Sequence, residues 1–288
     1  PEAICTLRSF EPLWPIPKSV LIGRYRLAGT PQLLVQDDYD PAQSRYTLRV
    51  TQTVPATPGQ PDKYPMVVPL AVGLLQEGAG VTEKRVLTVS ERTQSFSFAG
   101  VPARPVPSLL RGFSAPVKVE FPYSDAQLAM LVTQDDDGVS RWQAVRALFF
   151  RAFDHCRSGG SALPALDHAV ASLLADYQTD PALVACMLAF PSHRELADRD
   201  RQIDPAVIAT TRDALLRQLA STHRAAIIER YGHERIKLAG RAWSQNVVDV
   251  AHRALAGTLL AFINIAVDAE GRALALAHWR GADNLTDV

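Results

Sequence analysis

Apolar and polar residues alternate along the first part of the chain, from about Leu27 to Phe121. Tyr46, Leu48 and Val50 point to one side, while the polar residues between them point to the other, which is typical of a half-buried β-strand. The same alternation recurs at Val86 to Val89, at Phe96 with Phe98, and at Val117, Val119 and Phe121. Turn-forming clusters separate these segments at residues 37–41, 57–59 and 78–80. Six or seven short strands at this spacing predict an antiparallel β-sandwich.

After about Tyr123 the signals change to those of helices. Capping boxes are predicted at Ser124-Asp125-Ala126-Gln127, Ser140-Arg141-Trp142-Gln143 and Ser192-His193-Arg194-Glu195. Asp180-Pro181 and Asp204-Pro205 each place a good N-cap before a proline at the first helical position. Helical spacing of apolar residues occurs at Ile208, Leu215, Leu219 and Ala226, and again at Val248, Leu255, Leu259 and Phe262. This half is predicted to be all-helical, with connections at residues 157–160 and 232–240 and antiparallel helix pairs.

Several motifs resemble one known family. One motif is similar to the end of the immunoglobulin-like domain of bacterial alanyl aminopeptidases, the zinc peptidases of the aminopeptidase N type. It reads Pro105-Val106-Pro107-Ser108-Leu109-Leu110-Arg111-Gly112-Phe113-Ser114-Ala115-Pro116-Val117-Lys118. Residues 57–65 and 68–75 resemble an earlier part of that domain. Three further motifs resemble the family's helical domain: Arg141-Trp142-Gln143-Ala144, Ile203-Asp204-Pro205-Ala206 and Ala282-Asp283-Asn284-Leu285-Thr286-Asp287.

The resemblance implies a multidomain chain of β and then α structure. It implies an antiparallel immunoglobulin-like β-sandwich at residues 27–122, followed at residues 123–288 by an all-α helical-repeat domain of solenoid type, truncated at its C-terminal end. Residues 1–26 do not share the resemblance. Pro12, Pro15 and Pro17 surround Trp14 there and cannot continue a helix, so we expect an irregular segment with no packed core.

The zinc-binding signature of the family is missing. Family members bind zinc through H-E-x-x-H on one helix, with the motif glutamate as general base. His233-Glu234-Arg235-Ile236-Lys237 begins like this motif but has Lys237 where the second histidine is required, and His193 is followed by Arg194. We expect His193 and His233 to be solvated histidines near helix ends. The G-A-M-E-N motif is also absent, so the prediction is no metal ligand and no cofactor in this chain.

Other candidate sites are weak. Asp135-Asp136-Asp137-Gly138 lacks the alternating ligands of a calcium loop, and we expect a solvated turn before a cap at Ser140. Residues 158–161 are no nucleophile elbow, and residues 78–80 are no phosphate loop. The remaining histidines stand singly, at His155, His168, His223, His252 and His278, and the tryptophans Trp142, Trp243 and Trp279 are predicted to be packing residues. No catalytic residue is assigned, and substrate-binding residues remain unknown.

The bulk composition bears on location and partners. Lys and Arg together number 30, as do Asp and Glu, so the formal net charge of zero argues against a nucleic-acid partner. No apolar run reaches the ~18 residues of a membrane-spanning segment, and the first residues do not resemble a signal peptide. Three distant cysteines, Cys5, Cys156 and Cys186, are predicted to be reduced, buried thiols. We therefore expect a cytoplasmic protein with no membrane partner.

The resemblance implies a non-catalytic part of an aminopeptidase N-like enzyme, which releases N-terminal amino acids from peptides. This part would support the catalytic domain and wall the substrate chamber, with a separately encoded catalytic domain as the expected partner. The alternative is a stand-alone interaction module made of a β-sandwich and a helical solenoid.

One structural detail is predicted at the Arg111-Gly112-Phe113 corner. Gly112 interrupts an apolar run, so we expect a backbone angle or a close approach that a Cβ would obstruct. Phe113 is expected to pack under the sandwich or against the helices.

Overall fold

The computed structural model describes residues 28–161, 163–241, 243–265 and 268–282. The predictions for residues 1–26, and for most of the motif at 282–287, fall outside the described residues. The chain divides into two compact units, Pro1–Pro122 and Tyr123–Val288.

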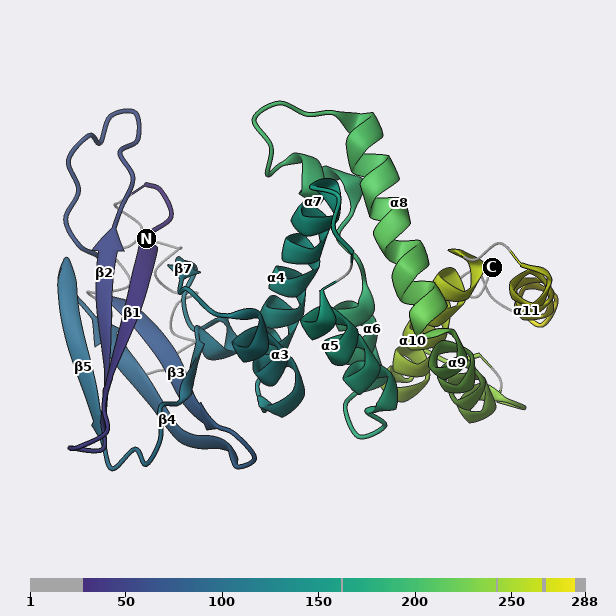
Figure 1. The fold of residues 1–288 in the computed structure, drawn as a ribbon, viewed down its shortest axis with the longest axis horizontal. Helices are drawn as coiled ribbons and strands as arrows, with labels where there is room; N and C mark the ends of the chain where they lie inside the picture. Colours follow the sequence, from purple (N-terminus) through teal and green to yellow (C-terminus); the bar gives the residue numbers. More distant parts are fainter. Residues whose placement is uncertain (1–27, 162, 242, 266–267, 283–288) are drawn as a thin grey trace, which may run out of the picture. The chain divides into compact units, whose positions relative to one another are not determined.

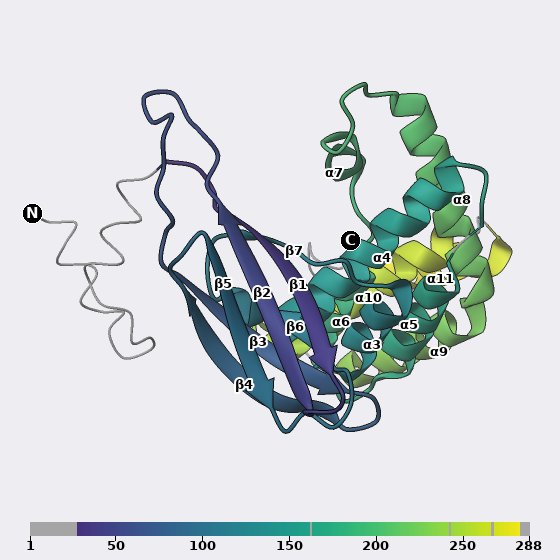
Figure 2. The same ribbon diagram turned by 60° about the vertical axis from the view of Figure 1, so that its left-hand side comes forward.

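The first unit is a sandwich of two sheets, seen as two layers of strands in Figures 1 and 2. Its strands are β1 (Gln32–Asp40), β2 (Arg45–Thr53), β3 (Val68–Gln76), β4 (Gly80–Val89), β5 (Thr93–Ala99), β6 (Val106–Leu109) and β7 (Lys118–Glu120). One sheet has the order β5-β2-β1-β7 and the other β4-β3-β6. Every pairing is antiparallel except that of β1 with β7, which is parallel and aligns Leu33 with Val119. The predicted antiparallel sandwich is confirmed, with one parallel pair at its edge, because the chain changes sheets after β6 and β7 runs beside β1 in the same direction.

The predicted alternation is confirmed in β2. Tyr46, Leu48 and Val50 have no exposed surface, and the β1 residues Leu33 and Val35 are equally buried. Burying each such side chain stabilises the fold by about 1.5–3 kcal/mol relative to leaving it exposed. The apolar face of this sheet therefore forms one half of the sandwich core.

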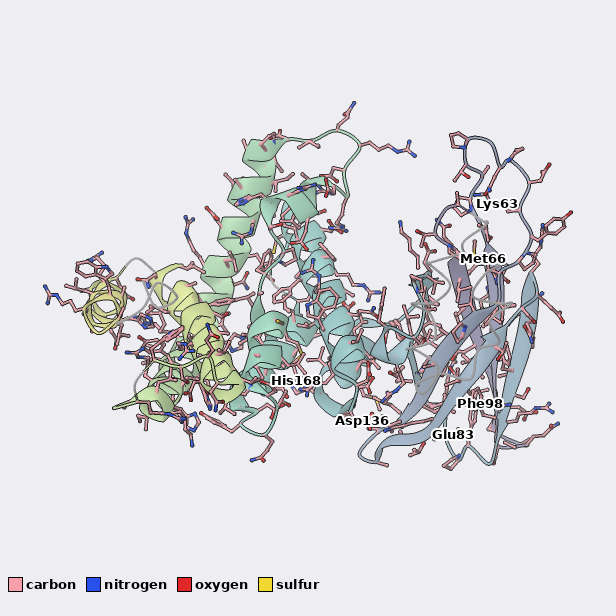
Figure 3. The ribbon with its side chains drawn as sticks, turned by 180° about the vertical axis from the view of Figure 1, so that it is seen from behind. Lys63, Met66, Glu83, Phe98, Asp136 and His168 are labelled. Atoms are coloured by element: carbon pink, nitrogen blue, oxygen red, sulfur yellow. The ribbon has the colours of Figure 1, made fainter. Side chains whose placement is uncertain are left out.

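A buried glutamine continues the same face of β2. Gln52 is 4% exposed, and its amide donates to the Met66 carbonyl at 2.8 Å and accepts from the Met66 amide at 2.5 Å. Met66 belongs to the β2–β3 connection, labelled together with Lys63 in Figure 3. These bonds satisfy a buried side chain that would otherwise cost about 1–3 kcal/mol.

The Arg111–Phe113 corner is a 3₁₀ turn with left-handed backbone angles at Leu110 (φ 58°), Gly112 (φ 58°) and Phe113 (φ 52°). The expected special backbone angle at Gly112 is confirmed. Phe113, however, is 57% exposed, so the prediction that it packs under the sandwich is wrong. The left-handed turn directs its side chain outward, while Arg111 lies against Gly73 and donates to Ser108 Oγ at 3.0 Å.

Gly112→Ala should lower the stability of the sandwich by about 1 kcal/mol, because an L-residue is strained at this φ although nothing lies within 4 Å of the added Cβ. Gly257→Ala is the matched control, since Gly257 lies inside helix α10 (Val247–Ile265) and also has open space around its Cβ. There alanine should stabilise by about 0.5–1 kcal/mol. Hydrogen exchange measured separately in the two units gives the change in stability for each variant. If both substitutions changed stability in the same direction and by the same amount, backbone strain at position 112 would not be the cause.

The second unit is helical (Figure 1). Its helices are α3 (Asp125–Gln134), α4 (Gly138–Arg157), α5 (Pro164–Ala175), α6 (Pro181–Leu188), α7 (His193–Ala197), α8 (Pro205–Thr222), α9 (Arg224–Leu238), α10 (Val247–Ile265) and α11 (Ala269–Arg280). The largest packing interfaces pair α9 with α10, α3 with α4 and α6 with α10.

Most of the predicted helix starts are confirmed. Ser124 and Ser192 form complete capping boxes, and Asp180 and Asp204 are N-caps followed by proline. The box at Ser140 is wrong, because α4 begins earlier, with Asp137 as N-cap accepting from the Ser140 amide at 2.8 Å.

Two predicted apolar faces are shorter than expected. Ile208, Leu215 and Leu219 are buried on α8, but that helix ends at Thr222, and Ala226 is an exposed residue of α9. Leu255, Leu259 and Phe262 are buried on α10, whereas Val248 is 56% exposed. Each stripe loses its outermost member, because Ala226 belongs to another helix and Val248 lies in the first turn of α10.

Helix α10 bears on the expectation that no segment spans a membrane. Among the described residues it is long and apolar enough, by length and composition, to cross a membrane. Its residues Leu255, Leu259 and Ile263 are buried, and the helix packs against α9 and α6. A core helix passes the same test of length and composition, so this signal is weak evidence for a membrane.

Candidate functional site

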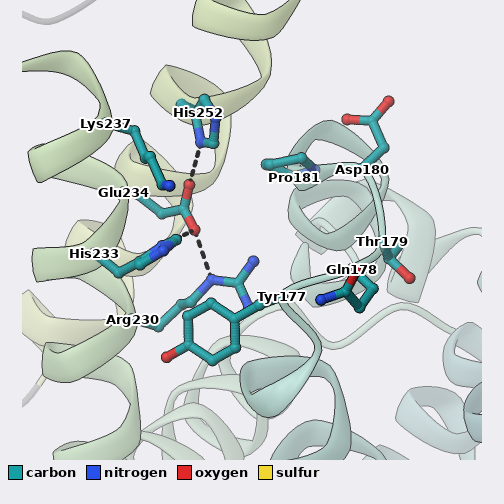
Figure 4. Close-up of a pocket in the computed structure, with 10 residues that line it drawn as sticks. All are labelled: Tyr177, Gln178, Thr179, Asp180, Pro181, Arg230, His233, Glu234, Lys237 and His252. Carbon is teal, nitrogen blue, oxygen red and sulfur yellow. Dashed lines mark hydrogen bonds and ion pairs between the residues drawn. The ribbon is translucent and has the colours of Figure 1, made fainter.

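A pocket of about 420 Å³ opens in the helical unit, between helices α9 and α10 and the connection from α5 to α6 (Figure 4). Tyr177, Gln178, Thr179, Asp180 and Pro181 come from the connection and the start of α6. Helix α9 contributes Arg230, His233, Glu234 and Lys237, and α10 contributes His252.

A buried carboxylate occupies the centre of the cluster. The Glu234 side chain has no exposed surface. Its Oε1 accepts from Arg230 Nε at 2.6 Å and lies 3.2 Å from His233 Nδ1, and its Oε2 lies 2.5 Å from His252 Nδ1 (Figure 4). Three basic side chains from two helices therefore converge on one glutamate.

The guanidinium of Arg230 links α9 to the end of α5 and to the connection that follows it. Arg230 is 1% exposed, and its Nη1 donates to the carbonyls of Leu174 at 3.3 Å and Asp176 at 2.6 Å. Its Cζ lies 4.2 Å from the centre of the Tyr177 ring, which in turn meets His233 edge-on at 4.7 Å. Burying such an ion pair seldom adds stability compared with apolar residues, so the cluster is a candidate for a functional role.

The cluster exists because α9 is continuous. Residues 232–240 were predicted as a connection, but α9 extends through Gly232 to Leu238, and Gly240 (φ 71°) lies just beyond its end. A glycine inside a helix costs only about 1 kcal/mol, which the packing of α9 offsets. Ile227, Tyr231 and Glu234 are buried on one face of this helix, so His233 belongs to the interior of a helix and is not a solvated helix-end residue.

These residues do not suit the zinc of the aminopeptidases. Lys237 follows His233 by one helical turn and would bring a cation where an imidazole ligand is needed. Nδ1 of His233 and of His252 both face Glu234. Within the described part of the chain, no group of three or more His, Cys, Asp or Glu side chains has an arrangement that suits a metal ion.

The hydrogen bonds of the cluster keep Glu234 ionised. Burial alone would raise the pKa of Glu234, but hydrogen bonds from His252, Arg230 and His233, together with the charge of Arg230, lower it below its ordinary value. The carboxylate thus remains an acceptor for both imidazoles at neutral pH, so each Nδ1 carries its proton toward Glu234.

Asp176 organises the connection that lines the pocket. Its carboxylate accepts from the Thr179 hydroxyl at 2.5 Å, from the backbone amides of Gln178 and Thr179, and from Arg141 at 3.1 Å. Burial would raise the pKa of Asp176, but these hydrogen bonds lower it to about 2.

The low pKa of Asp176 predicts a pH-dependent contribution to stability. Because the folded-state pKa lies below the unfolded value, the contribution is present above about pH 4 and is lost as the pH falls through about 2. Asp176→Asn should therefore cost about 2 kcal/mol at pH 7 and almost nothing below pH 2. Asp180→Asn is the control, because asparagine caps a helix equally well. The free energy of unfolding is measured with urea at each pH. If the stability lost in Asp176→Asn were the same at pH 7 and at pH 2, the ionised Asp176 carboxylate would not be its source.

The other sequence candidates lie apart from this cluster. Asp137 caps α4, and Asp135 accepts from the Asp137 amide at 3.0 Å, so this acidic turn is a link between helices. His193 is exposed at the start of α7, as expected. His223 contacts Asp167 at 3.3 Å, and the buried His278 lies 2.9 Å from the Tyr231 hydroxyl.

Two predictions about burial are wrong. Trp142, Trp243 and Trp279 are 37%, 46% and 58% exposed, so they are not core packing residues. Trp142 instead lies under the guanidinium of Arg146, at 5.0 Å. Cys186 is exposed and Cys156 only partly buried, and burial raises the pKa of the Cys156 thiol.

The sequence does not indicate the cluster, because His233 and His252 lie on different helices and share no local motif. The available signal was the spacing of Ile227, Arg230 and Glu234, which places two charged residues on the apolar face of one helix. The partners on α10 and on the α5–α6 connection become visible only in the fold.

Comparison with known proteins follows the same division of the chain. The family model described as a domain of unknown function (DUF3458) with an Ig-like fold matches residues 29–122. The model described as a domain of unknown function (DUF3458_C) with ARM repeats matches residues 125–288, more than half of the chain. The chain belongs to the DUF3458_C family.

Curated relatives of this DUF3458_C chain are aminopeptidases. Aminopeptidase N of Escherichia coli (strain K12) is 34% identical over 279 residues, and aminopeptidase N of Haemophilus influenzae is 32% identical over 278 residues. Each alignment covers 92% of the DUF3458_C chain but only 32% and 31% of the relative. The chain thus spans about a third of the length of the curated relatives it matches, and the resemblance to aminopeptidase N is confirmed.

A solved structure shows the same fold. The crystal structure of Legionella pneumophila aminopeptidase A in complex with aspartic acid superposes with a TM-score of 0.79 at 22% sequence identity. The match covers 94% of the DUF3458_C chain and 32% of that protein. The predicted fold, an Ig-like sandwich followed by a helical-repeat unit, is confirmed.

Proposed function

We propose that the chain is the non-catalytic part of an aminopeptidase N-like zinc peptidase, supporting a catalytic domain and walling its substrate chamber. The observation that carries this proposal is the alignment of both units, over 92% of the chain, with a single third of aminopeptidase N. The parent reaction is the release of N-terminal amino acids from peptides.

The chemistry of this reaction belongs to residues outside the present sequence. Neither H-E-x-x-H nor G-A-M-E-N occurs among the 288 residues, and the His233–Lys237 segment holds a buried ion pair instead. Residues 27–122 and 123–288 are the two domains we assign to this supporting role, and a polypeptide bearing H-E-x-x-H is the partner it requires. The free thiols of Cys156 and Cys186 suit a reducing compartment, so we place the protein in the cytoplasm.

A peptidase assay with and without a catalytic polypeptide tests the proposal. The chain alone should neither hydrolyse alanyl-anilide substrates nor bind zinc stoichiometrically. Together with the H-E-x-x-H polypeptide of the same genome, whether fused or separate, it should form a complex that hydrolyses them. Hydrolysis by the chain alone would overturn the proposal, as would a catalytic polypeptide that neither binds the chain nor changes activity in its presence.

A further inference from the structure

The pocket of Figure 4 contains cationic donors that the fold does not use. Arg230 engages Nε with Glu234 and Nη1 with two carbonyls, but its Nη2 makes no hydrogen bond among the described residues. Lys237 lines the same pocket, is exposed, and makes no ion pair or hydrogen bond with any described residue. A buried guanidinium with one unused nitrogen and an unpaired ammonium line the same pocket, which is a basis for binding an anion.

One cation of the pocket has no ion-pair partner among the described residues. Arg230 is paired with Glu234, whereas Lys237 is paired with no described carboxylate. Asp180 also lines the pocket, but its Oδ1 accepts from the Ala182 amide as the cap of α6, and Figure 4 shows its carboxylate directed away from Glu234. An anion bound beside Lys237 would therefore meet a cation that no described carboxylate pairs with.

The imidazoles add two further polar edges. His233 and His252 both turn Nδ1 toward Glu234, and neither Nε2 forms a hydrogen bond among the described residues. When an imidazole is protonated, its Nε2 becomes another donor, while its Nδ1 stays with the glutamate. Tyr177 provides an apolar ring beside these groups.

We propose that this pocket binds a carboxylate group, with Lys237 Nζ and Arg230 Nη2 as its donors. A carboxylate carries a single negative charge and has two oxygens for two separate donors. Phosphate matches less well, because Nε and Nη1 of Arg230 are already engaged and no bidentate fork remains. A divalent cation is disfavoured, since the groups without partners are themselves cationic.

Two sources supply this chemistry: the C-terminal carboxylate of a peptide and a free small carboxylic acid. Binding to the purified chain is measured by calorimetry and by the imidazole NMR signals of His233 and His252, with tri-alanine, tri-alanine amide and acetate as probes. We expect saturable binding of tri-alanine and shifts of both imidazole signals. Acetate binding as tightly as tri-alanine assigns the site to small acids, whereas tri-alanine binding at least about tenfold tighter assigns it to peptide ends.

Lys237 provides the decisive variant, because it is exposed and its replacement leaves the Arg230–Glu234 pair intact. Lys237→Met should weaken binding at least about tenfold, while Lys237→Arg should remain within about threefold of the unmodified chain. Arg194→Met, at a 90% exposed arginine on α7 outside the pocket, should have no effect.

Equal binding of tri-alanine and its amide would overturn the proposal, as would unchanged affinity in Lys237→Met or no binding of any probe. The assay contains no catalytic polypeptide and measures no hydrolysis. Its result is therefore independent of whether the proposed role in an aminopeptidase is correct.

Discussion

Arg230→Met is expected to destabilise the helical unit by about 3–5 kcal/mol, because it leaves a buried glutamate without its main counter-charge. Glu234 has no exposed side-chain surface, and Arg230 lies 2.6 Å from it. The same substitution removes the donor to the carbonyls of Leu174 and Asp176. Native-state hydrogen exchange of amides in α9 and α10 measures the loss in this unit alone.

Two further variants identify the cause. Arg194→Met, at a 90% exposed arginine, should change stability by no more than about 0.5 kcal/mol. The double change Arg230→Met with Glu234→Leu should be more stable than Arg230→Met alone, since a buried pair is often replaced by apolar residues at little cost. If the double variant were less stable than the single one, charge burial would not be the reason for the loss.

Phe149→Ala is expected to cost about 3–5 kcal/mol by leaving a cavity in the core of the helical unit. Phe149 on α4 has no exposed surface, and its ring meets that of Phe190 edge-on with the centres 4.9 Å apart. The protein should unfold at lower urea concentration, with a correspondingly faster exchange of the α4 amides.

Phe113→Ala is the matched aromatic truncation in the sandwich. If the corner joined the two units, truncating Phe113 would cost about 3–5 kcal/mol. Because Phe113 is 57% exposed, we now expect a loss of less than about 1 kcal/mol. If Phe113→Ala lowered the stability as much as Phe149→Ala, the burial of the side chain would not determine the loss of stability.

The sequence predicted the element types well where a local pattern carries the information. Period-two alternation in β2 places Tyr46, Leu48 and Val50 in the core, because successive side chains of a strand point to opposite faces. Ser124 and Ser192 cap helices as expected, because a capping box uses only residues three positions apart. The family motifs likewise indicated the fold of both units.

Local patterns misled where several signals compete within a few residues. Asp137 and Ser140 are both good N-caps, and the earlier residue begins α4. Two glycines around residues 232–240 suggested a break, yet only Gly240 has a left-handed backbone angle and lies at a helix end. The choice depends on how far packing extends each helix, which a short window does not contain.

The sequence by itself determined the order of a β unit and an α unit, most helix starts, and the lack of the peptidase zinc motif. Only the tertiary structure decided the pairing of β1 with β7, the exposure of Phe113, and the cluster at Glu234. A buried charge is tolerated only when its partners are in place. Those partners lie up to 56 residues away in the chain, in α10, at the end of α5 and in the α5–α6 connection. No local pattern reports such distances, so folding alone creates the pocket.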